Sequence, residues 1–314
     1  MAVVLLAGLA PDLDALWHLP APLTLMRAYG TATHSLAGAG ALAVAIAAGV
    51  WAVSRKRGRV PPSVPPGLAA LLAPAFAAAG LHLLLDIATS TGIEPWWPFS
   101  ITRAAWNLTA TFDVVLILLL LFFAFLAPLI AMVKEEIGAG SDPLPSRVWP
   151  MAALALAGAW FGAREVLHHR AEHTLGTAQY LGRTPLHWAA FPAGTSPFRW
   201  HGLVETDLFL AEVEVALESG QRFSPESAAI HYKPDPSPLV DATAAAPLAR
   251  AYTALASFPI LTVESSPDGA RAELHELGDS LLHTHDGSWI ALITLDAQSH
   301  VTGQELFYVH SKSY

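Results

Sequence analysis

The chain has 314 residues, of which 53% are hydrophobic and only 14% are charged, and its mean hydropathy is +0.43. Soluble domains carry about 25% charged residues, so this composition indicates a membrane protein and excludes a disordered chain. The net charge of −9 argues against nucleic-acid binding. The absence of cysteine excludes disulfides, thiolate metal sites and cysteine nucleophiles.

Charge is distributed unevenly along the chain. Residues 1–169 hold nine basic and nine acidic side chains, so the whole net charge of −9 lies in residues 170–314. The sequence therefore predicts two domains, a transmembrane helical domain over residues 1–169 and an acidic, water-exposed domain over residues 170–314.

A membrane-spanning helix needs about 20 mainly apolar residues. Four segments meet this requirement: Ser35–Val53, Gly67–Ala88, Phe112–Val133 and Val148–Leu167. The apolar stretch Ala2–Ala10 is too short to span and is expected to be the last turns of a helix whose beginning is missing. The alternative is a short apolar N-terminus that packs against the bundle.

Orientation follows from the basic segment Arg55–Arg59 between the first two spans, because positively charged loops stay in the cytoplasm. Four crossings then place residues 89–111 in an outer loop and Lys134–Arg147 in an inner loop. The acidic half leaves the membrane near His168 and lies outside the cytoplasm. We expect a multi-pass protein of the inner (cytoplasmic) membrane whose C-terminal domain is extracytoplasmic.

The acidic half shows the pattern of an α+β domain with an antiparallel sheet. Asp241–Ser257 has helical composition, and Pro247 is expected to break or kink it. Runs with β-branched and aromatic residues in partial alternation predict strands at Leu203–Leu217, Ala228–Tyr232, Ile260–Glu264, Trp289–Leu295 and Glu305–His310.

Ionisable residues from distant parts of the sequence are predicted to lie at the same outer depth of the bundle. Such residues near hydrocarbon are functional candidates unless they are paired or hydrated. A site of carboxylates and imidazoles without thiols suits zinc, manganese or magnesium. The candidate metal ligands are Asp12, Asp14, His34, His82 and Asp86, and Asp113 begins the third span beside them.

Each of these residues also has a structural interpretation. The PDLD segment with Asp12 and Asp14 suits an Asp-capped turn, and His34 suits the start of a helix. His82 and Asp86, four residues apart on one helix, suit a buried hydrogen-bonded pair. Asp113 suits an acid at a helix N-terminus, where the dipole favours negative charge. Their joint occurrence on one face favours a site over independent structural roles.

These motifs carry a family resemblance. PDLD, then THS, then HLLLDIATSTGIEPWWPFS and an Asp that opens the next span resemble the YdjM-like family of membrane-bound, predicted metal-dependent hydrolases, over about residues 5–115. The resemblance implies that Asp12, Asp14, His34, His82, Asp86 and Asp113 are the family's defining polar positions. Members usually begin with a helix that carries a further Thr-His motif, which this sequence does not contain before PDLD.

Other histidines are less specific. Glu165, His169 and His173 share one helix face, which suits either a metal site or a solvated polar face, and we favour the polar face. His283 and His285 are expected in a surface strand or turn.

The outer loop Glu94–Trp106 has two interpretations. Its tryptophans Trp96, Trp97 and Trp106 suit anchors at the membrane–water boundary. Alternatively the loop is a lid over the carboxylates, with Gly92 permitting the turn and Arg103 binding an anionic substrate such as a phosphate.

The favoured hypothesis is a membrane-bound hydrolase in which a divalent metal ion activates water against an ester or phosphoester at the membrane surface. Asp113 would orient the water or a ligand histidine as a general base, and an amphiphilic or lipid-derived substrate from the lipid bilayer would suit the location. No Gly-x-Ser-x-Gly motif supports a serine hydrolase. The alternative is a non-catalytic membrane protein whose polar cluster is structural or ion-binding and whose outer domain binds a partner. A transporter has less support, because no internal repeat is present.

Overall fold

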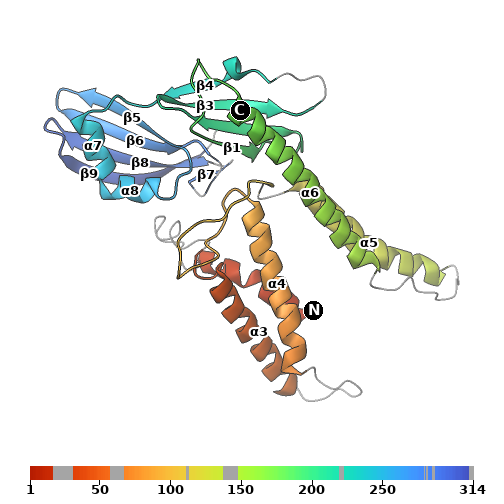
Figure 1. Ribbon diagram of the computed structural model, residues 1–314. Helices are drawn as coiled ribbons and strands as arrows, with labels where there is room; N and C mark the ends of the chain where they lie inside the picture. Colours follow the sequence, from red (N-terminus) through yellow and green to blue (C-terminus); the bar gives the residue numbers. More distant parts are fainter. Residues whose placement is uncertain are drawn as a thin grey trace. The chain divides into compact units, whose positions relative to one another are not determined.

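A computed structural model describes residues 1–16, 31–56, 67–110, 113–136, 148–218, 223–278, 280, 282–284 and 287–310 (Figure 1). The chain divides into two compact units, one of residues 1–106 with 233–314 and one of residues 107–232. The domain boundary predicted at residue 169 stays a prediction, and helix α6 (Val148–Thr177) runs through that position without a break.

The first helices pack through alanines. Helices α1 (Ala2–Leu9), α3 (Leu36–Lys56) and α4 (Leu68–Ala88) contact one another. Side chains at four-residue spacing form their shared core: Ala39, Ala43 and Ala47 of α3, Leu71, Ala75, Ala79 and Leu83 of α4, and Val3 and Ala7 of α1. Small residues let helix backbones approach closely, which is how helices associate in lipid. The packing of α1 against α3 and α4 is compatible with both interpretations of the N-terminal stretch, the last turns of a longer helix and a short apolar N-terminus.

Within the described residues, two helices have the length and composition to cross a membrane, Leu36–Arg55 and Leu68–Ala88. They correspond to the first two predicted spans. Helix α5 (Val114–Glu136) pairs with α6 and carries exposed apolar side chains, among them Leu118, Phe122 and Phe125. The count of four spans stays a prediction. Most of the predicted inner loop and residues 57–59 of the basic segment lie outside the described residues.

Helix α6 joins an apolar segment to a sheet. Its 30 residues extend about 45 Å, which exceeds the roughly 30 Å hydrocarbon thickness of a bilayer. The C-terminal turns place Ala171 and Leu175 against buried Trp200 and Val213 of the sheet. Gly202 lies under Leu175, where a Cβ atom would clash with the leucine side chain. The helix and the sheet therefore share one core.

The first sheet is antiparallel with strand order β1-β2-β3-β4, namely His187–Pro192, Arg199–Glu205, Phe209–Ala216 and Ala229–Tyr232. The predicted strand Leu203–Leu217 is wrong as a single element, because a turn at residues 206–208 divides it between β2 and β3. The Thr206 hydroxyl donates to the Phe209 carbonyl and accepts from the Leu208 and Phe209 amides, which stabilises this turn.

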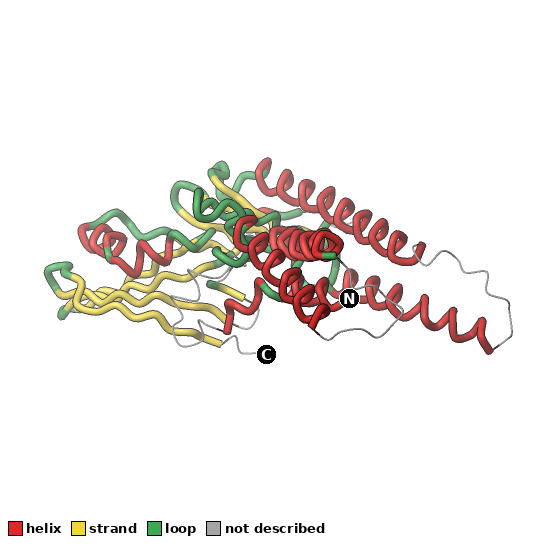
Figure 2. The backbone as a smooth tube through the Cα atoms, turned by 90° about the horizontal axis from the view of Figure 1, so that it is seen from below, coloured by secondary structure: helices red, strands yellow, loops and turns green. Residues whose placement is uncertain are grey.

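The second sheet confirms an antiparallel sheet near the C-terminus. Its strands are β5 (Pro259–Ser266), β6 (Gly269–Glu276), β7 (His283–Thr284), β8 (Gly287–Asp296) and β9 (Val301–His310), in the order β5-β6-β8, with β7 and β9 both paired to β8. Helices α7 (Pro238–Ala245) and α8 (Pro247–Thr253) cover one face (Figures 1 and 2). As predicted, the helical segment breaks at Pro247.

A buried carboxylate ties the second sheet to the chain that follows α8. Glu276 is 2% exposed and accepts hydrogen bonds from the amides of Ser257 at 2.6 Å, Phe258 at 2.9 Å and Gly278 at 2.6 Å. Burial raises the pKa of Glu276, and the backbone hydrogen bonds oppose that rise. The folded state therefore holds the proton more tightly than the unfolded state.

Because of this raised pKa, the sheet is expected to lose stability as the pH rises from about 4.5 through the folded pKa of Glu276. Glu276→Gln should remove this pH dependence. It should also lower stability by about 1–3 kcal/mol, because an amide nitrogen would face a backbone N–H. Hydrogen–deuterium exchange of β6, corrected for intrinsic exchange, measures both effects. Glu264→Gln, at an exposed position of β5, is the control, and an unchanged pH profile in Glu276→Gln would contradict the assignment.

Candidate metal centre

His34 is fixed by the turn that starts α3. The Ser35 hydroxyl donates to the Ala32 carbonyl at 2.9 Å and accepts from the Gly38 amide at 3.0 Å, which caps the helix. Gly38 packs against the carbonyl of Ala32 so closely that a Cβ atom would clash with it. The turn places the His34 side chain in the interior with no exposed surface. Its Nδ1 lies 3.1 Å from the Thr33 hydroxyl.

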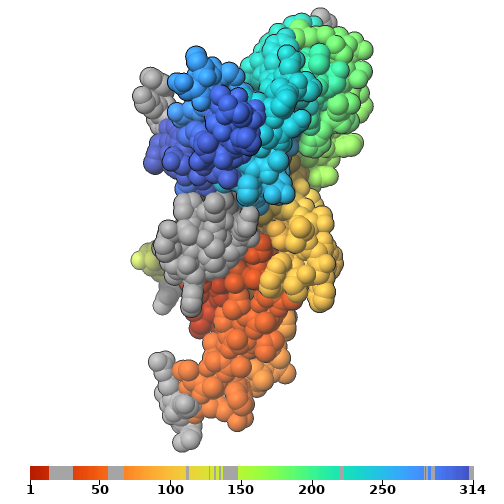
Figure 3. Space-filling view, turned by 90° about the vertical axis from the view of Figure 1, so that its left-hand side faces the viewer, coloured from red at the N-terminus to blue at the C-terminus, as the bar shows by residue number. Residues whose placement is uncertain are grey.

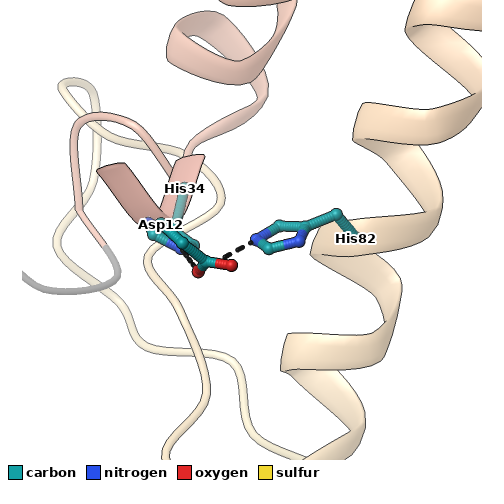
Figure 4. A group of neighbouring side chains, drawn as sticks. All are labelled: Asp12, His34 and His82. Carbon is teal, nitrogen blue, oxygen red and sulfur yellow. Dashed lines mark hydrogen bonds and ion pairs between the residues drawn. The ribbon is translucent and has the colours of Figure 1, made fainter. Parts of the chain in front are cut away.

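Three further side chains surround the His34 ring. His82 and Asp86 lie one turn apart near the end of α4, and Asp12 lies on the short 3₁₀ helix η1 (Pro11–Leu16). Figure 4 shows Asp12, His34 and His82 pointing toward one another from separate elements. Exposure rises from none at His34 to 14% at His82, 26% at Asp86 and 50% at Asp12. The cluster is therefore open to solvent on the side of Asp12.

The distances among these atoms fit a shared cation. His34 Nε2 lies 3.3 Å from Asp12 Oδ1 and 3.8 Å from Asp86 Oδ2, and His82 Nε2 lies 3.5 Å and 3.2 Å from the same two oxygens. Two atoms each about 2.1 Å from a tetrahedral ion are about 3.4 Å apart. The ligand atoms of Asp12, His34 and His82 all lie within 4.8 Å of one another.

Hydrogen bonding explains only part of this arrangement. The pair His34–Asp12 forms a hydrogen bond at 3.3 Å. His82 Nε2 is buried and forms no hydrogen bond, although two carboxylate oxygens lie within 3.5 Å. Buried polar atoms normally have a partner. The imidazole and carboxylate donors suit a borderline or hard divalent metal, and the cluster is a candidate metal site.

The other two predicted acids have different surroundings. Asp14 belongs to η1, but its side chain lies outside the described residues. Asp113 precedes α5 in the second unit, where its carboxylate accepts from the Leu116 amide at 2.9 Å and from Trp160 Nε1 at 3.0 Å. These contacts match the interpretation of Asp113 as a helix-capping acid, which also fastens α5 to α6. Its catalytic role stays a prediction.

Arg103 stabilises the base of the outer loop. Its guanidinium donates to the Thr91 carbonyl at 2.5 Å and to the Gly92 carbonyl at 3.1 Å. Gly92 has the left-handed φ of 57°, and a Cβ atom there would clash with the Ala104 carbonyl, so the predicted turn at Gly92 is confirmed. Burial raises the pKa of Glu94, and the charge of Arg103 opposes this. Substrate binding by Arg103 stays a prediction.

The remaining histidine motifs are mostly exposed. Glu165, His169 and His173 are exposed on α6, as the polar-face interpretation predicts. His168, on the opposite and buried face, lies 3.0 Å from the Ala190 carbonyl. His283 belongs to the short strand β7, whereas His285 lies outside the described residues.

Sequence reasoning did not assign the residues that shape the cluster. Ser35 caps α3 beside His34, and the sequence signal for it is a serine directly before an apolar run. Phe99 and Ile101 lie in the outer loop, but sequence reasoning gave them no role, and their exposure in the structure draws attention to them.

Fold and cluster together define a membrane protein that has two candidate spans, a C-terminal antiparallel-sheet region and a His/Asp group able to bind a metal ion. Residues 1–171 match the family described as YdjM inner membrane protein, which is more than half of the chain. The chain therefore belongs to this family, as the motifs predict. No curated protein and no solved structure matches the chain.

Proposed function

We propose that the chain is a membrane-bound, metal-dependent hydrolase that acts on an ester or phosphoester at the outer membrane–water boundary. The observation that carries the proposal is the distance of 3.2–3.8 Å from each imidazole Nε2 of His34 and His82 to the carboxylate oxygens of Asp12 and Asp86. This spacing fits one divalent ion, and a borderline ion such as zinc or manganese suits the two imidazoles.

Asp12, His34, His82 and Asp86 would hold the ion. A bound divalent ion supplies Lewis acidity, which polarises a carbonyl or phosphoryl oxygen and makes water a better nucleophile near neutral pH. His34, enclosed by its turn, fixes one donor in place, and the helical geometry of α4 fixes two more. Asp12 is the most exposed member, so water and substrate would approach the ion on its side. Asp113 is the further candidate for orienting water.

The proposed topology has four crossings with residues 170–314 outside the cytoplasm. Arg55 and Lys56 lie at the end of α3 that is remote from His34, so the positive-inside rule places the cluster on the outer side. Helix α5 exposes apolar side chains widely, which is typical of a lipid-facing helix. A reporter fused after Tyr314 should report an extracytoplasmic location, and a cytoplasmic signal would contradict this topology.

The function is tested by metal content and hydrolysis together. Full-length protein purified without chelator is expected to carry stoichiometric metal and to hydrolyse a phosphoester or carboxylic ester. The His82→Ala/Asp86→Ala variant should lose both properties, because it removes two of the four ligands. The His169→Ala variant, which changes an exposed histidine of α6, is the matched control and should keep both.

A second candidate is a non-catalytic membrane protein whose cluster stabilises the helices. The hydrogen bond of His34 with Asp12 favours this candidate, because it joins η1 to the start of α3 without a metal ion. Wild-type protein that carries no metal would support this candidate and contradict the hydrolase. Stoichiometric metal without hydrolysis of either substrate class would indicate an ion-binding role.

A further inference from the structure

The loop after α4 forms a stiff finger, which we define as residues 93–104. The Ile93 amide donates to the Ala104 carbonyl at 3.0 Å, and the Ala104 amide donates to the Ile93 carbonyl at 2.8 Å, so the two legs pair at the base. Arg103 fastens the same base through the carbonyls of Thr91 and Gly92. The shape of the finger is therefore set before any ligand binds.

Apolar side chains cover the tip of the finger. Phe99 is 91% exposed, Ile101 81% and Trp96 60%. Such a group of large apolar side chains on a projecting loop marks an interaction surface. Aromatic side chains are typical of the membrane–water boundary.

Several backbone and hydroxyl groups of the tip are hydrogen-bonded within the finger. The amides of Trp97, Phe99 and Ser100 donate to carbonyls of Glu94 and Trp96. The Ser100 hydroxyl donates to the Thr102 hydroxyl at 2.9 Å and accepts from the Thr102 amide at 3.1 Å. Because these groups are paired internally, transfer of the tip from water into an apolar layer leaves them hydrogen-bonded.

The finger is attached to the elements that carry the cluster. The Leu36 amide, two residues after His34, donates to the Pro95 carbonyl at 3.0 Å. The Trp106 amide donates to the carbonyl of Ile87, the residue after Asp86, at 2.7 Å. In Figure 3 the yellow atoms of this loop bulge from the surface next to the orange atoms of α3 and α4. The finger thus lies where two candidate spans meet the bilayer boundary.

We propose that the tip of the finger inserts into the lipid leaflet beside the cluster and that the cluster takes its substrate from that leaflet. The first part rests on the exposure and hydrogen bonding of the tip alone. The second part rests on the proposed hydrolase function, and it names the substrate class as a lipid-borne ester or phosphoester. The acyl chains would stay in the leaflet beside Phe99 and Ile101 while the polar group reaches Asp12.

Insertion is tested with spin labels, because the chain contains no cysteine and any single cysteine is labelled specifically. Phe99→Cys and Ile101→Cys are labelled in full-length protein in phosphatidylglycerol–phosphatidylethanolamine vesicles. A high collision rate of the spin label with oxygen indicates that the label lies in lipid. A high collision rate with a nickel chelate indicates that it lies in water. Phe76→Cys on α4 is the lipid reference, and Ala297→Cys in the β8–β9 turn is the water reference.

Labels at Phe99 and Ile101 should match the lipid reference. Nickel accessibility equal to that at Ala297 would overturn insertion. Protection from both reagents would overturn it as well, because it would show that the finger is covered by protein.

Delivery of substrate is tested with Phe99→Ser/Ile101→Ser, which leaves the cluster intact. Its metal content should equal that of the wild type.

Hydrolysis of a phospholipid in vesicles should fall about tenfold or more, since the two exposed apolar side chains that would enter the leaflet are lost. Hydrolysis of a short-chain soluble phosphoester should not change. Equal losses for both substrates would overturn the role in delivery. If the wild type hydrolyses neither substrate but the labels at Phe99 and Ile101 lie in lipid, the hydrolase function is contradicted and insertion of the finger is still supported.

Discussion

Replacing His34 with alanine is expected to lower the affinity for divalent metal by more than about 100-fold, because the loss of groups that merely orient a ligand already costs 10–100-fold. His34 is the one fully buried member of the cluster, and its Nε2 lies 3.3 Å from Asp12 and 3.8 Å from Asp86. Water cannot reach this position easily to replace the lost imidazole. Competition with a chromophoric chelator measures the affinity, and hydrolytic activity should fall in parallel.

Controls separate ligation from folding. His34→Gln keeps a polar side chain in the buried turn but is a weaker metal ligand, so it should preserve helix content and still lose metal. Asp12→Asn should have a smaller effect than His34→Ala, because Asp12 is half exposed and water can substitute for it. If His34→Ala has normal helix content and unchanged metal affinity, the assignment of the cluster as a metal site is wrong.

The first spans were predictable because their physical signals are local. Segments of about 20 apolar residues predicted helices over Ser35–Val53 and Gly67–Ala88, and the structure has them at Leu36–Lys56 and Leu68–Ala88. Ser35 marks the start of α3 as a cap, and the basic residues Arg55 and Lys56 extend its end. Pro247, likewise, separates α7 from α8 by a local steric rule.

The sheets were harder to predict because their strands depend on long-range pairing. Strand β1 lacks a clear alternation of apolar and polar residues, and it forms by pairing with β2 and packing on α6. The run Leu203–Leu217 hides its turn, since Thr206 supplies the hydrogen bonds of residues 206–208 without glycine or proline. β-structure follows from neighbours more than from intrinsic preference.

The candidate site was predictable to the extent that helix geometry determines it. His82 and Asp86 must share a face because a helix has 3.6 residues per turn. The approach of Asp12 and His34 to that face follows from the packing of α1, α3 and α4. The sequence predicted only that these residues lie at the same depth, from the order of the spans. Asp113 differs, since its partner Trp160 is 47 residues away and depends on the pairing of α5 with α6.

Removal of Arg164 is expected to destabilise the unit of residues 107–232 by about 3 kcal/mol or more. Arg164 is 3% exposed, and its guanidinium donates to the carbonyls of Leu108 at 2.7 Å and Pro197 at 3.1 Å. The guanidinium carbon also lies 4.3 Å from the ring centre of Trp200. Alanine would leave two carbonyls without a charged donor and remove the cation–π contact.

Arg164 lies near the end of the predicted fourth span, Val148–Leu167. The structure buries Arg164 with His168, Ala171 and Leu175, a spacing of three and four residues that marks one packed helix face. Arg164 therefore joins α6 to the loop between β1 and β2 and to Trp200 of β2.

Hydrogen–deuterium exchange of β1 and β2 tests this role in full-length protein. A loss of about 3 kcal/mol corresponds to exchange about 100-fold faster in Arg164→Ala. Arg164→Lys should show an intermediate exchange rate. The lysine ammonium keeps the charge, but unlike the planar guanidinium it cannot bind both carbonyls while it lies flat on the Trp200 ring. Arg170→Ala, on the exposed face of the same helix, should leave exchange unchanged. Equal exchange in Arg164→Ala and Arg170→Ala would show that α6 is held by its apolar contacts alone, with Ala171 and Leu175 sufficient to join helix and sheet.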